Sequence, residues 1–384
     1  MTQPKKIVLL GATGSIGKST LQVLRKHSDR LELIGVSANS NSVKLKEIVR
    51  EFKVPHAYLP ESAGEVDDFP KESTLDRSLN GLTALASLTE ADLIVVAIVG
   101  ASGLEPTLAA LAAGTDIVLA NKESLVLGGE LVMNTAKKNQ VQVLPADSEH
   151  NAVFQCIQGE QKRNLESIIL TASGGPFREL PIKDLKDVTI EQALNHPNWS
   201  MGNKVTIDSA TMANKGLELI EARWLFDLPP ERLEVVIHPT SVVHALIRFV
   251  DGCCLAQLSP PSMTFALQHA LLYPDRAEGV QPSLDFSQPL NLNFTPPSLD
   301  RFPCLRLAQD ALAQGGSAPL VFNAANELAV EAFLLNRIGF LQIPDIIDET
   351  LSTFSHQSKN DLKTLLSLDA EARRIAADLI GPTT

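Results

Sequence analysis

The densest group of residues that could do chemistry lies between His196 and Phe226, which reads HPNWSMGNKVTIDSATMANKGLELIEARWLF. This segment combines a tryptophan in a Pro- and Gly-containing loop with two lysines, several hydroxyl groups and two glutamates three residues apart, Glu218 and Glu221. A helix that only fills a core needs none of these loop residues. Groups of these types suit a site that binds an anion and a metal ion.

An acidic pair, Asp147 and Glu149, follows a predicted strand, so both carboxylates can converge on one point. Paired carboxylates bind Mg²⁺ or Mn²⁺, with water and substrate completing the coordination shell. Glu218 or Glu221 could supply a third ligand. The alternative is that Asp147 caps a helix that begins at Ala152 and that Glu149 is solvated.

Two other segments offer what a phosphate monoester needs, namely backbone N–H groups, hydroxyls and a cation. They are Ser173-Gly174-Gly175 and the run from Ser209 to Lys215, in which Lys215 stands beside Asn214. The alternative is that Ser-Gly-Gly is a simple turn and Lys215 a surface residue. The segment from His196 to Gly202 is predicted to be a loop that could close over a substrate, with the indole of Trp199 excluding water or only plugging the surface.

The N-terminal segment predicts nucleotide binding. An apolar run from Lys6 to Leu10 is followed by the glycine turn GATGSIG (residues 11–17) and by a helical pattern from Ser19 to Arg25. Glycines allow a close approach to a pyrophosphate, whose charge the helix N-terminus favours. The spacing is GxxGxxG rather than GxGxxG. Residues 17–19 resemble the end of a P-loop, but five residues instead of four separate the flanking glycines; a glycine turn without a ligand is the third interpretation.

The next predicted strand, Leu31 to Val36, ends in Ser37-Ala38-Asn39-Ser40-Asn41. An NAD enzyme usually carries Asp or Glu here to hold the ribose hydroxyls. The neutral stretch therefore favours NADP, although it holds no arginine and Lys44 is only a candidate phosphate contact.

Further strands recur with helical intervals, which predicts a doubly wound parallel sheet. They are Leu93–Val99, Asp116–Leu119, Val141–Leu144 and Ser167–Leu170. Polar clusters follow three of them, at Asn121-Lys122-Glu123, Asp147 to His150 and Ser173 to Gly175. Because ligands of open α/β sheets bind outside the carboxyl ends of the strands, we expect a shared crevice.

The C-terminal half has a different pattern. Strands at 233–237, 242–249 and 253–258, with Asp251-Gly252 as a hairpin turn, predict a second α/β domain with an antiparallel portion. A Pro- and Asn-rich linker is expected from Tyr273 to Pro303. Helical spacing at 305–313, 318–335 and 362–379 predicts a small helical bundle.

Composition limits the function classes. The chain of 384 residues has a formal net charge of −12, which argues against nucleic acid or an acidic membrane as a partner. No apolar run reaches membrane-spanning length, and Met1 to Lys6 leave no room for a signal peptide. Four cysteines without a CxxC pair predict reduced thiols in the cytoplasm, and vicinal Cys253 and Cys254 are expected to be buried or half-buried.

Together these motifs resemble the 1-deoxy-D-xylulose 5-phosphate reductoisomerase family over nearly the whole chain. The resemblance runs through GATGSIGKSTL, LANKESLV, LPADSEHNAVFQ, LTASGGPFRE, the segment from His196 to Phe226, VIHPTSVVHALI and FNAANELAVEAF. It implies an α/β fold with an N-terminal Rossmann-like parallel sheet, a second α/β domain for catalysis and dimerisation, and a small C-terminal helical bundle. The expected ranges are 1–147 for NADPH binding, 148–272 for the metal site and lid loop, 273–303 for the linker and 304–384 for the helical domain.

The resemblance also implies the site residues. Metal ligands would be Asp147, Glu149 and Glu218. Substrate would contact Ser148, Glu149, Ser173, His196, Ser209, Asn214, Lys215 and Glu218, and Lys122, Glu149, His196 and Trp199 would take part in catalysis. NADPH would be lined by Thr13, Gly14, Ser15, Ile16, Asn39, Ser40, Asn41, Asn121, Glu123 and Gly202. His244 matches a histidine that the family uses near the active site.

The implied reaction has two stages. A ketose phosphate, 1-deoxy-D-xylulose 5-phosphate, rearranges by retro-aldol cleavage and re-addition on a divalent ion (Mg²⁺ or Mn²⁺, with Co²⁺ also suitable). NADPH then reduces the aldehyde to 2-C-methyl-D-erythritol 4-phosphate, a precursor of isoprenoids in the non-mevalonate pathway. A homodimer is expected. One departure concerns the cofactor: many relatives carry Gly or a basic residue where this chain has Asn39-Ser40.

Two other hypotheses compete with this one. An NADP-dependent semialdehyde dehydrogenase would need a nucleophilic cysteine near a histidine, and Cys156 falls in a helical apolar pattern. An NADP-sensing module without catalysis would bind the cofactor but would not need the acidic residues.

Overall fold

The computed structural model describes residues 3–357 and 361–381. The chain forms two compact units. The first unit comprises Met1–Ser124, Val132–Asn151 and Ser262–Ser283; the second comprises Leu125–Leu131, Ala152–Pro261 and Leu284–Thr384. The predicted division into four ranges stays a prediction, and the expectation about a leader concerns Met1, which lies outside the described residues.

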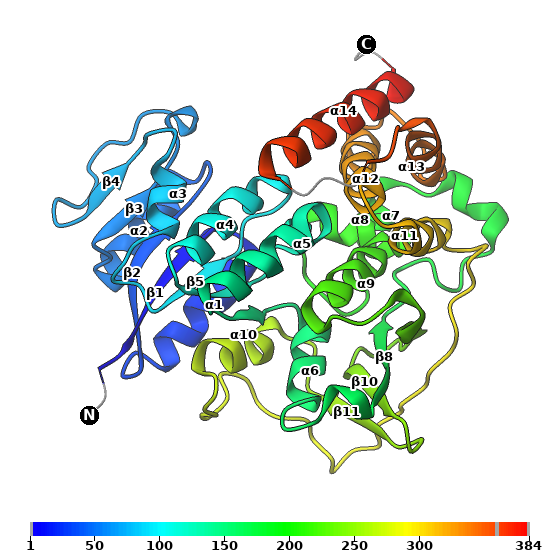
Figure 1. Cartoon of the computed structure of the whole chain (residues 1–384), viewed down its shortest axis with the longest axis horizontal. Helices are drawn as coiled ribbons and strands as arrows, with labels where there is room; N and C mark the ends of the chain where they lie inside the picture. The colour runs from blue at the N-terminus through cyan, green and yellow to red at the C-terminus, as the bar shows by residue number, and fades with distance from the viewer. Residues whose placement is uncertain (1–2, 358–360, 382–384) are drawn as a thin grey trace. The chain divides into compact units, whose positions relative to one another are not determined.

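The first unit contains a sheet of seven parallel strands in the order β4-β3-β2-β1-β5-β6-β7 (Figure 1). The strands are β1 (Lys5–Leu10), β2 (Leu31–Ser37), β3 (His56–Tyr58), β4 (Thr74–Asp76), β5 (Leu93–Val96), β6 (Asp116–Leu119) and β7 (Val143–Pro145). Residues 7–10 and 94–96 are completely buried. Strands covered on both faces read as continuous apolar runs, so these patterns predict the parallel sheet correctly.

Helices connect these strands. They are α1 (Ser15–Lys26), α2 (Ser42–Phe52), α3 (Gly81–Ala86), α4 (Leu104–Ala112) and α5 (Lys122–Asn139), of which Leu125–Leu131 belong to the second unit. The first unit also contains α10 (Met263–Leu272), which comes from a distant part of the chain and packs against α1. The strand order reverses at β1, which pairs with β2 on one side and β5 on the other. The carboxyl ends of β1 and β5 therefore flank a topological switch point, where open α/β sheets bind their ligands.

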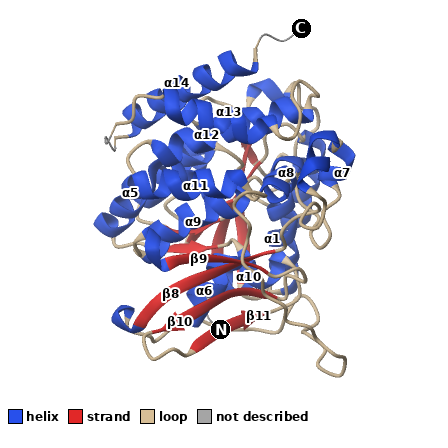
Figure 2. Cartoon of the chain, turned by 90° about the vertical axis from the view of Figure 1, so that its right-hand side faces the viewer, coloured by secondary structure: helices blue, strands red, loops and turns tan. Residues whose placement is uncertain are grey.

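The second unit contains a mixed sheet in the order β11-β10-β8-β9. Its strands are β8 (Leu165–Ala172), β9 (Leu233–Ile237), β10 (Val243–Phe249) and β11 (Cys254–Leu258). Figure 2 shows them side by side in this order. β10 is antiparallel to both β8 and β11, while β8 is parallel to β9. The predicted hairpin turn is present, with Gly252 at φ 84°.

Two sequence expectations about this sheet are wrong. The strand predicted at 167–170 as part of the first sheet is the centre of β8, in the second sheet. Its apolar run indicates burial but does not say which neighbours it pairs with. Cys253 and Cys254 are both exposed, because β11 is an edge strand whose first three residues face solvent.

The remaining helices of the second unit include the predicted bundle. They are α7 (Ile190–Leu194), α8 (Asn203–Thr211), α9 (Ala213–Phe226), α11 (Pro303–Gln314), α12 (Ala318–Leu334), α13 (Gln342–Thr353) and α14 (Leu362–Ile380), with α6 (Ser148–Cys156) shared between the units. In the bundle α12 packs against α11, α13 and α14. Helix α13 was not among the predicted helices, although Ile343, Ile346, Ile347 and Thr350 bury one helical face.

The predicted linker has neither helix nor strand between residues 274 and 302, and Thr295 forms an isolated bridge with Ile237. In the described part of the chain, no helix is both long and apolar enough to cross a membrane.

Candidate active site

The glycine turn of the first unit needs glycine at two of its three positions. Gly11 has φ 86°, and a Cβ there would lie 2.4 Å from the carbonyl oxygen of Ala97. A Cβ on Gly17 would lie 2.4 Å from the carbonyl oxygen of Ala12. Gly14 is exposed, and a Cβ there would meet nothing closer than 3.5 Å. Packing therefore does not require a glycine at position 14. A glycine there does allow a ligand to approach the backbone closely.

The start of α1 fits a pyrophosphate. Gly14 is the N-cap and has no side chain that could accept a hydrogen bond from the first-turn N–H groups. Those donors and the positive end of the helix dipole favour an anion. The predicted cofactor residues Thr13, Ser15 and Ile16 lie at this turn.

Ser37, which the sequence analysis did not single out, joins the ends of β1 and β2. Its Oγ accepts a hydrogen bond from the Gly11 N–H at 2.9 Å, and its carbonyl oxygen accepts one from Ala12 at 2.8 Å. Asn41 is also committed to the fold, since its Oδ1 accepts a hydrogen bond from the Lys44 N–H and caps α2. Of the expected ribose-side residues, Asn39 and Ser40 are exposed.

Asn121 is completely buried and uses its amide on the protein itself. Its Nδ2 donates to the carbonyl oxygens of Ile98 at 2.8 Å and Gly100 at 3.0 Å, and to Glu123 Oε2 at 3.0 Å. Its Oδ1 accepts from the Ser124 N–H at 2.9 Å and so caps α5. Asn121 therefore holds the loop after β5 in place beside the glycine turn.

The acidic pair lies at the carboxyl end of β7. Carboxylate oxygens of Asp147 and Glu149 lie within 4.8 Å of each other. Asp147 Oδ2 forms an ion pair with Lys122 Nζ at 2.6 Å, and its Oδ1 accepts from the Ser148 N–H at 2.8 Å. Glu149 Oε2 accepts from the Ser148 hydroxyl at 2.5 Å. The spacing and the hard oxygen donors fit Mg²⁺ or Mn²⁺.

The competing interpretation of this pair is only partly correct. Asp147 does precede a helix, but α6 begins at Ser148 rather than Ala152, and Glu149 is half-buried rather than solvated. His150, which the sequence analysis did not select, is fully buried with a ring nitrogen within 4.8 Å of the Asp147 carboxylate. A histidine directly after the acidic pair could have signalled it.

In the second unit, one imidazole joins two serines that are 36 positions apart in the chain. His196 Nε2 lies 3.0 Å from Ser173 Oγ and 3.1 Å from Ser209 Oγ. Gly175, at φ 67°, makes this possible, because a Cβ there would lie 2.8 Å from the Ser209 carbonyl oxygen. Its missing side chain lets the turn after β8 touch the end of α8.

The protonation state of His196 follows from its other nitrogen. Nδ1 accepts hydrogen bonds from the backbone N–H groups of Asn198 at 3.2 Å and Trp199 at 3.0 Å. Nδ1 therefore carries no proton, and the proton of the neutral ring sits on Nε2 and points at the serines. Burial lowers the pKa of His196, which also favours the neutral ring. The residue is a hydrogen-bond donor rather than a cation.

The face of α9 brings three other predicted residues together. Lys215 and Glu218 are 3% and 1% exposed and form an ion pair. Asn214 Nδ2 donates to Glu218 Oε1 at 2.5 Å. Lys215 is therefore no surface residue. Glu221 is also 1% exposed, so burial does not decide which glutamate would bind a metal ion.

The junction between α8 and α9 fixes the spacing of these groups. Met212 ends α8 and precedes α9 in a left-handed conformation, with φ 62°. Such a conformation is uncommon for a residue with a side chain and persists only where its surroundings impose it. The turn at Met212 therefore separates Ser209, on α8, from the polar residues Asn214, Lys215 and Glu218, on α9.

Asp208 anchors α8, and the sequence analysis missed it. Its side chain is 1% exposed, forms an ion pair with Lys204 at 2.9 Å and accepts from Asn326 Nδ2 of α12 at 2.8 Å. Only the fold reveals this role, since a charged residue in a polar segment normally faces solvent.

The segment predicted to form a lid, residues 196–202, is bonded through Asn198 to the turn between β9 and β10. Asn198 Nδ2 donates to the Pro239 carbonyl at 2.6 Å and to Ser241 Oγ at 3.0 Å. The ring of Trp199 packs edge-on against that of His244, with 6.2 Å between centroids. His244 is buried and its Nε2 lies 3.0 Å from Ser259 Oγ, so the ring against which Trp199 packs is fixed in orientation. Gly202 is exposed and begins α8 as its N-cap.

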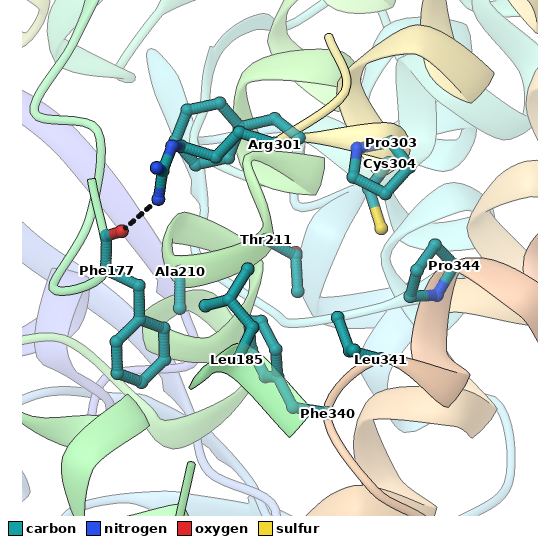
Figure 3. Close-up of a pocket in the computed structure, with 11 residues that line it drawn as sticks. Phe177, Leu185, Ala210, Thr211, Arg301, Pro303, Cys304, Phe340, Leu341 and Pro344 are labelled. Carbon is teal, nitrogen blue, oxygen red and sulfur yellow. Dashed lines mark hydrogen bonds between the residues drawn. The ribbon is translucent and has the colours of Figure 1, made fainter. Parts of the chain in front are cut away.

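A small cavity elsewhere in the second unit is not a phosphate site. It is lined mostly by apolar side chains, including Phe177, Leu185 and Phe340 (Figure 3). The charged residue in its lining, Arg301, donates to the carbonyl oxygens of Phe177 at 3.0 Å and Leu180 at 2.5 Å. The guanidinium is thus used to fix the loop after β8.

Cys156 does not fit a nucleophile. It is half-buried at the end of α6, and burial raises the pKa of its thiol. A reactive cysteine needs the opposite shift. The semialdehyde dehydrogenase hypothesis loses the residue on which it depends.

Comparison with known proteins gives one consistent result. Three family models match the chain: 1-deoxy-D-xylulose 5-phosphate reductoisomerase at residues 7–129, its C-terminal domain at 143–226, and the DXP reductoisomerase C-terminal domain at 258–375. The 1-deoxy-D-xylulose 5-phosphate reductoisomerase of Geobacter metallireducens is 49% identical, covering 98% of this chain and 99% of that protein. The protein of the same name from Clostridium perfringens is 46% identical over 96% and 98%.

Solved structures agree with the sequence comparison. A crystal structure of DOX-P reductoisomerase in complex with NADPH, fosmidomycin and magnesium has a TM-score of 0.93 and 43% identity, covering 98% of both chains. The 1-deoxy-D-xylulose 5-phosphate reductoisomerase from Zymomonas mobilis in complex with NADPH has a TM-score of 0.91 and 40% identity, covering 99% of this chain and all of that one. This confirms the predicted fold class. The chain belongs to the 1-deoxy-D-xylulose 5-phosphate reductoisomerase family.

Proposed function

We propose that this chain converts 1-deoxy-D-xylulose 5-phosphate into 2-C-methyl-D-erythritol 4-phosphate, using NADPH and a divalent metal ion. The observation that carries the proposal is the acidic pair: two carboxylates within 4.8 Å of each other, beside Lys122, on the sheet that carries the glycine turn. A cofactor-sensing module would need the glycine turn but not the acidic residues.

The metal ligands in this proposal are Asp147, Glu149 and Glu218. Three carboxylates with water and substrate oxygens form a shell that suits Mg²⁺ or Mn²⁺. When bound, the ion polarises the substrate carbonyl and orients the neighbouring hydroxyl. Lys122, already paired with Asp147, keeps a positive charge and N–H donors beside the reacting oxygens.

The substrate phosphate binds, in this proposal, to Ser173, Ser209, Asn214 and Lys215. Two hydroxyls, an amide and an ammonium match the oxygens and charge of a phosphate monoester. The buried position of Lys215 supports this, because a desolvated ammonium interacts more strongly with an anion than an exposed one. His196 donates through Nε2–H and cannot act as a general acid without losing its contacts to the lid backbone.

The proposed reaction has two stages, rearrangement by retro-aldol cleavage and re-addition followed by reduction. The protein must keep two fragments together between the stages, which proximity makes efficient. Closure of the lid loop, with Trp199 over the substrate, would keep water out and the fragments in. The glycine turn, next to the loop that Asn121 holds, would bind NADPH, which would supply the hydride.

We further propose a homodimer. β11 is the edge strand of the second sheet, and Leu255 on it is 46% exposed. An unpaired edge with an exposed apolar side chain invites pairing with a second copy. We also assign the protein to the cytoplasm, since all four cysteines are free.

The test is NADPH oxidation in the presence of 1-deoxy-D-xylulose 5-phosphate after chelator treatment, followed by addition of Mg²⁺ or Mn²⁺. We expect oxidation only with metal, and the product should be identified by mass spectrometry. Folded protein that binds NADPH but oxidises none under either condition would favour the sensing module instead.

A further inference from the structure

Two lysines lie at corresponding positions on neighbouring helices of the first unit. Lys18 is in the first turn of α1, which follows β1, and Lys44 is in the first turn of α2, which follows β2. Because β1 and β2 are adjacent and parallel, both helices begin at the same edge of the sheet. This is the edge at which the glycine turn is found.

The relative position of the two helix starts is fixed. Ser37, at the end of β2, accepts hydrogen bonds from Gly11 and Ala12 in the glycine turn. Asn41 caps α2 by accepting from the backbone N–H of Lys44, so the start of that helix is also ordered. The two lysines therefore extend from a rigid frame.

The side chains of Lys18 and Lys44, which extend from these two helix starts, are close enough to interact with each other. Burial lowers the pKa of Lys44, and the charge of Lys18, whose side chain is close enough to interact directly, lowers it further. Glu47 offsets this only in part. Within the described part of the chain, neither lysine forms a salt bridge. Two ammonium groups held together repel each other, and an anion between them would remove that repulsion.

The loop after β2 has no charge of its own to bind such an anion. Residues 37–41 are Ser, Ala, Asn, Ser and Asn. The side chains of Ser37 and Asn41 already serve the fold, as described above, and Asn39 and Ser40 are exposed but neutral. In a dinucleotide-binding sheet this loop lies beside the adenine ribose, whose 2′ position distinguishes NADP from NAD.

We infer that Lys18 and Lys44 together bind the 2′-phosphate of NADPH and that this pair, rather than residues 37–41, sets the preference for NADPH over NADH. The inference rests on the proposed function for the identity of the cofactor. NADH offers only a hydroxyl at this position and leaves the two ammonium groups facing each other without compensation. The pair thus favours NADPH over NADH, because only the 2′-phosphate compensates the two positive charges.

The experiment measures dissociation constants of NADPH and NADH by cofactor fluorescence, on the full chain without substrate or metal. The variants are Lys18→Gln, Lys44→Gln and the double variant. We expect each single change to weaken NADPH about tenfold, the size of one lost charge-assisted hydrogen bond, and to leave NADH unchanged. The wild-type affinity for NADPH should also fall more steeply with salt than that for NADH, a difference that the double variant loses.

Lys46→Gln is the matched control, because Lys46 is on the same helix but donates to the carbonyl oxygen of Asp67. It should bind both cofactors as the wild type does. Lys44→Arg should retain most of the preference, because it keeps a positive charge at this position.

Two results would overturn the inference: unchanged NADPH affinity in the double variant, or equal weakening of NADPH and NADH. Because binding is measured without turnover, the outcome is separate from that of the proposed function. If the wild type converts its substrate but the double variant keeps full preference for NADPH, only the role of the lysine pair is refuted. If the wild type shows no turnover but the variants lose NADPH affinity selectively, only the proposed reaction is refuted.

Discussion

The two units prepare for their ligands in different ways. In the first unit the proposed cofactor turn is mainly backbone, because Gly11 and Gly17 leave no room for a side chain there. In the second unit the proposed phosphate site consists of side chains that already bind one another: Ser173 and Ser209 through His196, and Lys215 with Glu218.

This difference has a physical consequence. A binding site made of backbone groups is already ordered before its ligand binds, so binding costs little conformational free energy. Side chains paired with one another must exchange partners when a phosphate binds, so binding there is coupled to rearrangement. His196 shows the coupling directly, because the same ring contacts both serines and the lid backbone.

The largest effect should come from Glu149 and Glu218, two of the three carboxylates proposed as metal ligands. Glu149→Gln and Glu218→Gln should each lower kcat/KM on the order of a thousandfold, since a lost metal contribution is worth several kcal/mol. NADPH affinity should stay within about twofold of the wild type, because the glycine turn is unchanged. Glu231→Gln, at an exposed position, is the control. Loss of NADPH binding in both variants would contradict the assignment.

The two tryptophans separate lid function from packing. Trp199→Ala should lower turnover about thirtyfold without changing the unfolding transition, because Trp199 is half-buried in a loop and its ring packs edge-on against that of His244. Trp224 packs where a Cβ on Gly129 would lie 2.2 Å from its ring, so Trp224→Phe should lower stability but not turnover. Steady-state kinetics and urea unfolding of both variants decide this. Full activity of Trp199→Ala would contradict the proposal that Trp199 closes over the substrate.

Glycine substitutions test the claim that the first unit relies on backbone. Gly17→Ala forces a Cβ against backbone atoms and should lower the free energy of unfolding by about 2 kcal/mol, with a parallel loss of NADPH affinity. Gly14→Ala should leave the stability unchanged, since its Cβ meets nothing closer than 3.5 Å. Chemical denaturation of the pair gives the answer, and equal stability of both variants would show that the turn can relax.

The smallest expected effect is a pH dependence of the stability, which one half-buried histidine in each unit should cause. Burial, with the nearby charge of Arg276, lowers the pKa of His269 from 6.5 to about 4, and burial also lowers that of His196. The unfolded chain then binds more protons than the folded one below pH 6.5, so stability is lost as the pH falls toward about 4. His269→Gln should flatten this dependence and leave turnover intact, whereas His196→Gln should also impair turnover. Unfolding curves between pH 7 and 4.5 that keep the wild-type slope in His269→Gln would contradict the shift.

Much of the first unit could be predicted from the sequence. Continuous apolar runs mark its buried parallel strands, and glycine spacing marks its turn, because both constraints are local. The acidic pair was predicted for the same reason, since it directly follows a strand. The hydrogen bonds of Asn121 could not be predicted, because their acceptors, the carbonyl oxygens of Ile98 and Gly100, lie in another loop.

The second unit was harder to predict because its order depends on contacts between distant segments. The strand at 167–170 was found but assigned to the wrong sheet, since an apolar run does not identify its neighbours. The tautomer of His196 depends on where two backbone N–H groups point, and the anchoring role of Asp208 depends on Asn326 of a later helix. The motifs identified these residue types, while the fold defines what each one contacts.

The most direct test of the account is the affinity for Mn²⁺, measured by electron paramagnetic resonance on the wild type, Glu149→Gln and Glu218→Gln without substrate. If Glu149 and Glu218 bind the same ion, both variants should lose affinity at least tenfold, by similar factors. Wild-type affinity in Glu218→Gln, together with loss in Glu149→Gln, would show that Glu218 is not a ligand and would contradict the proposed ligand set.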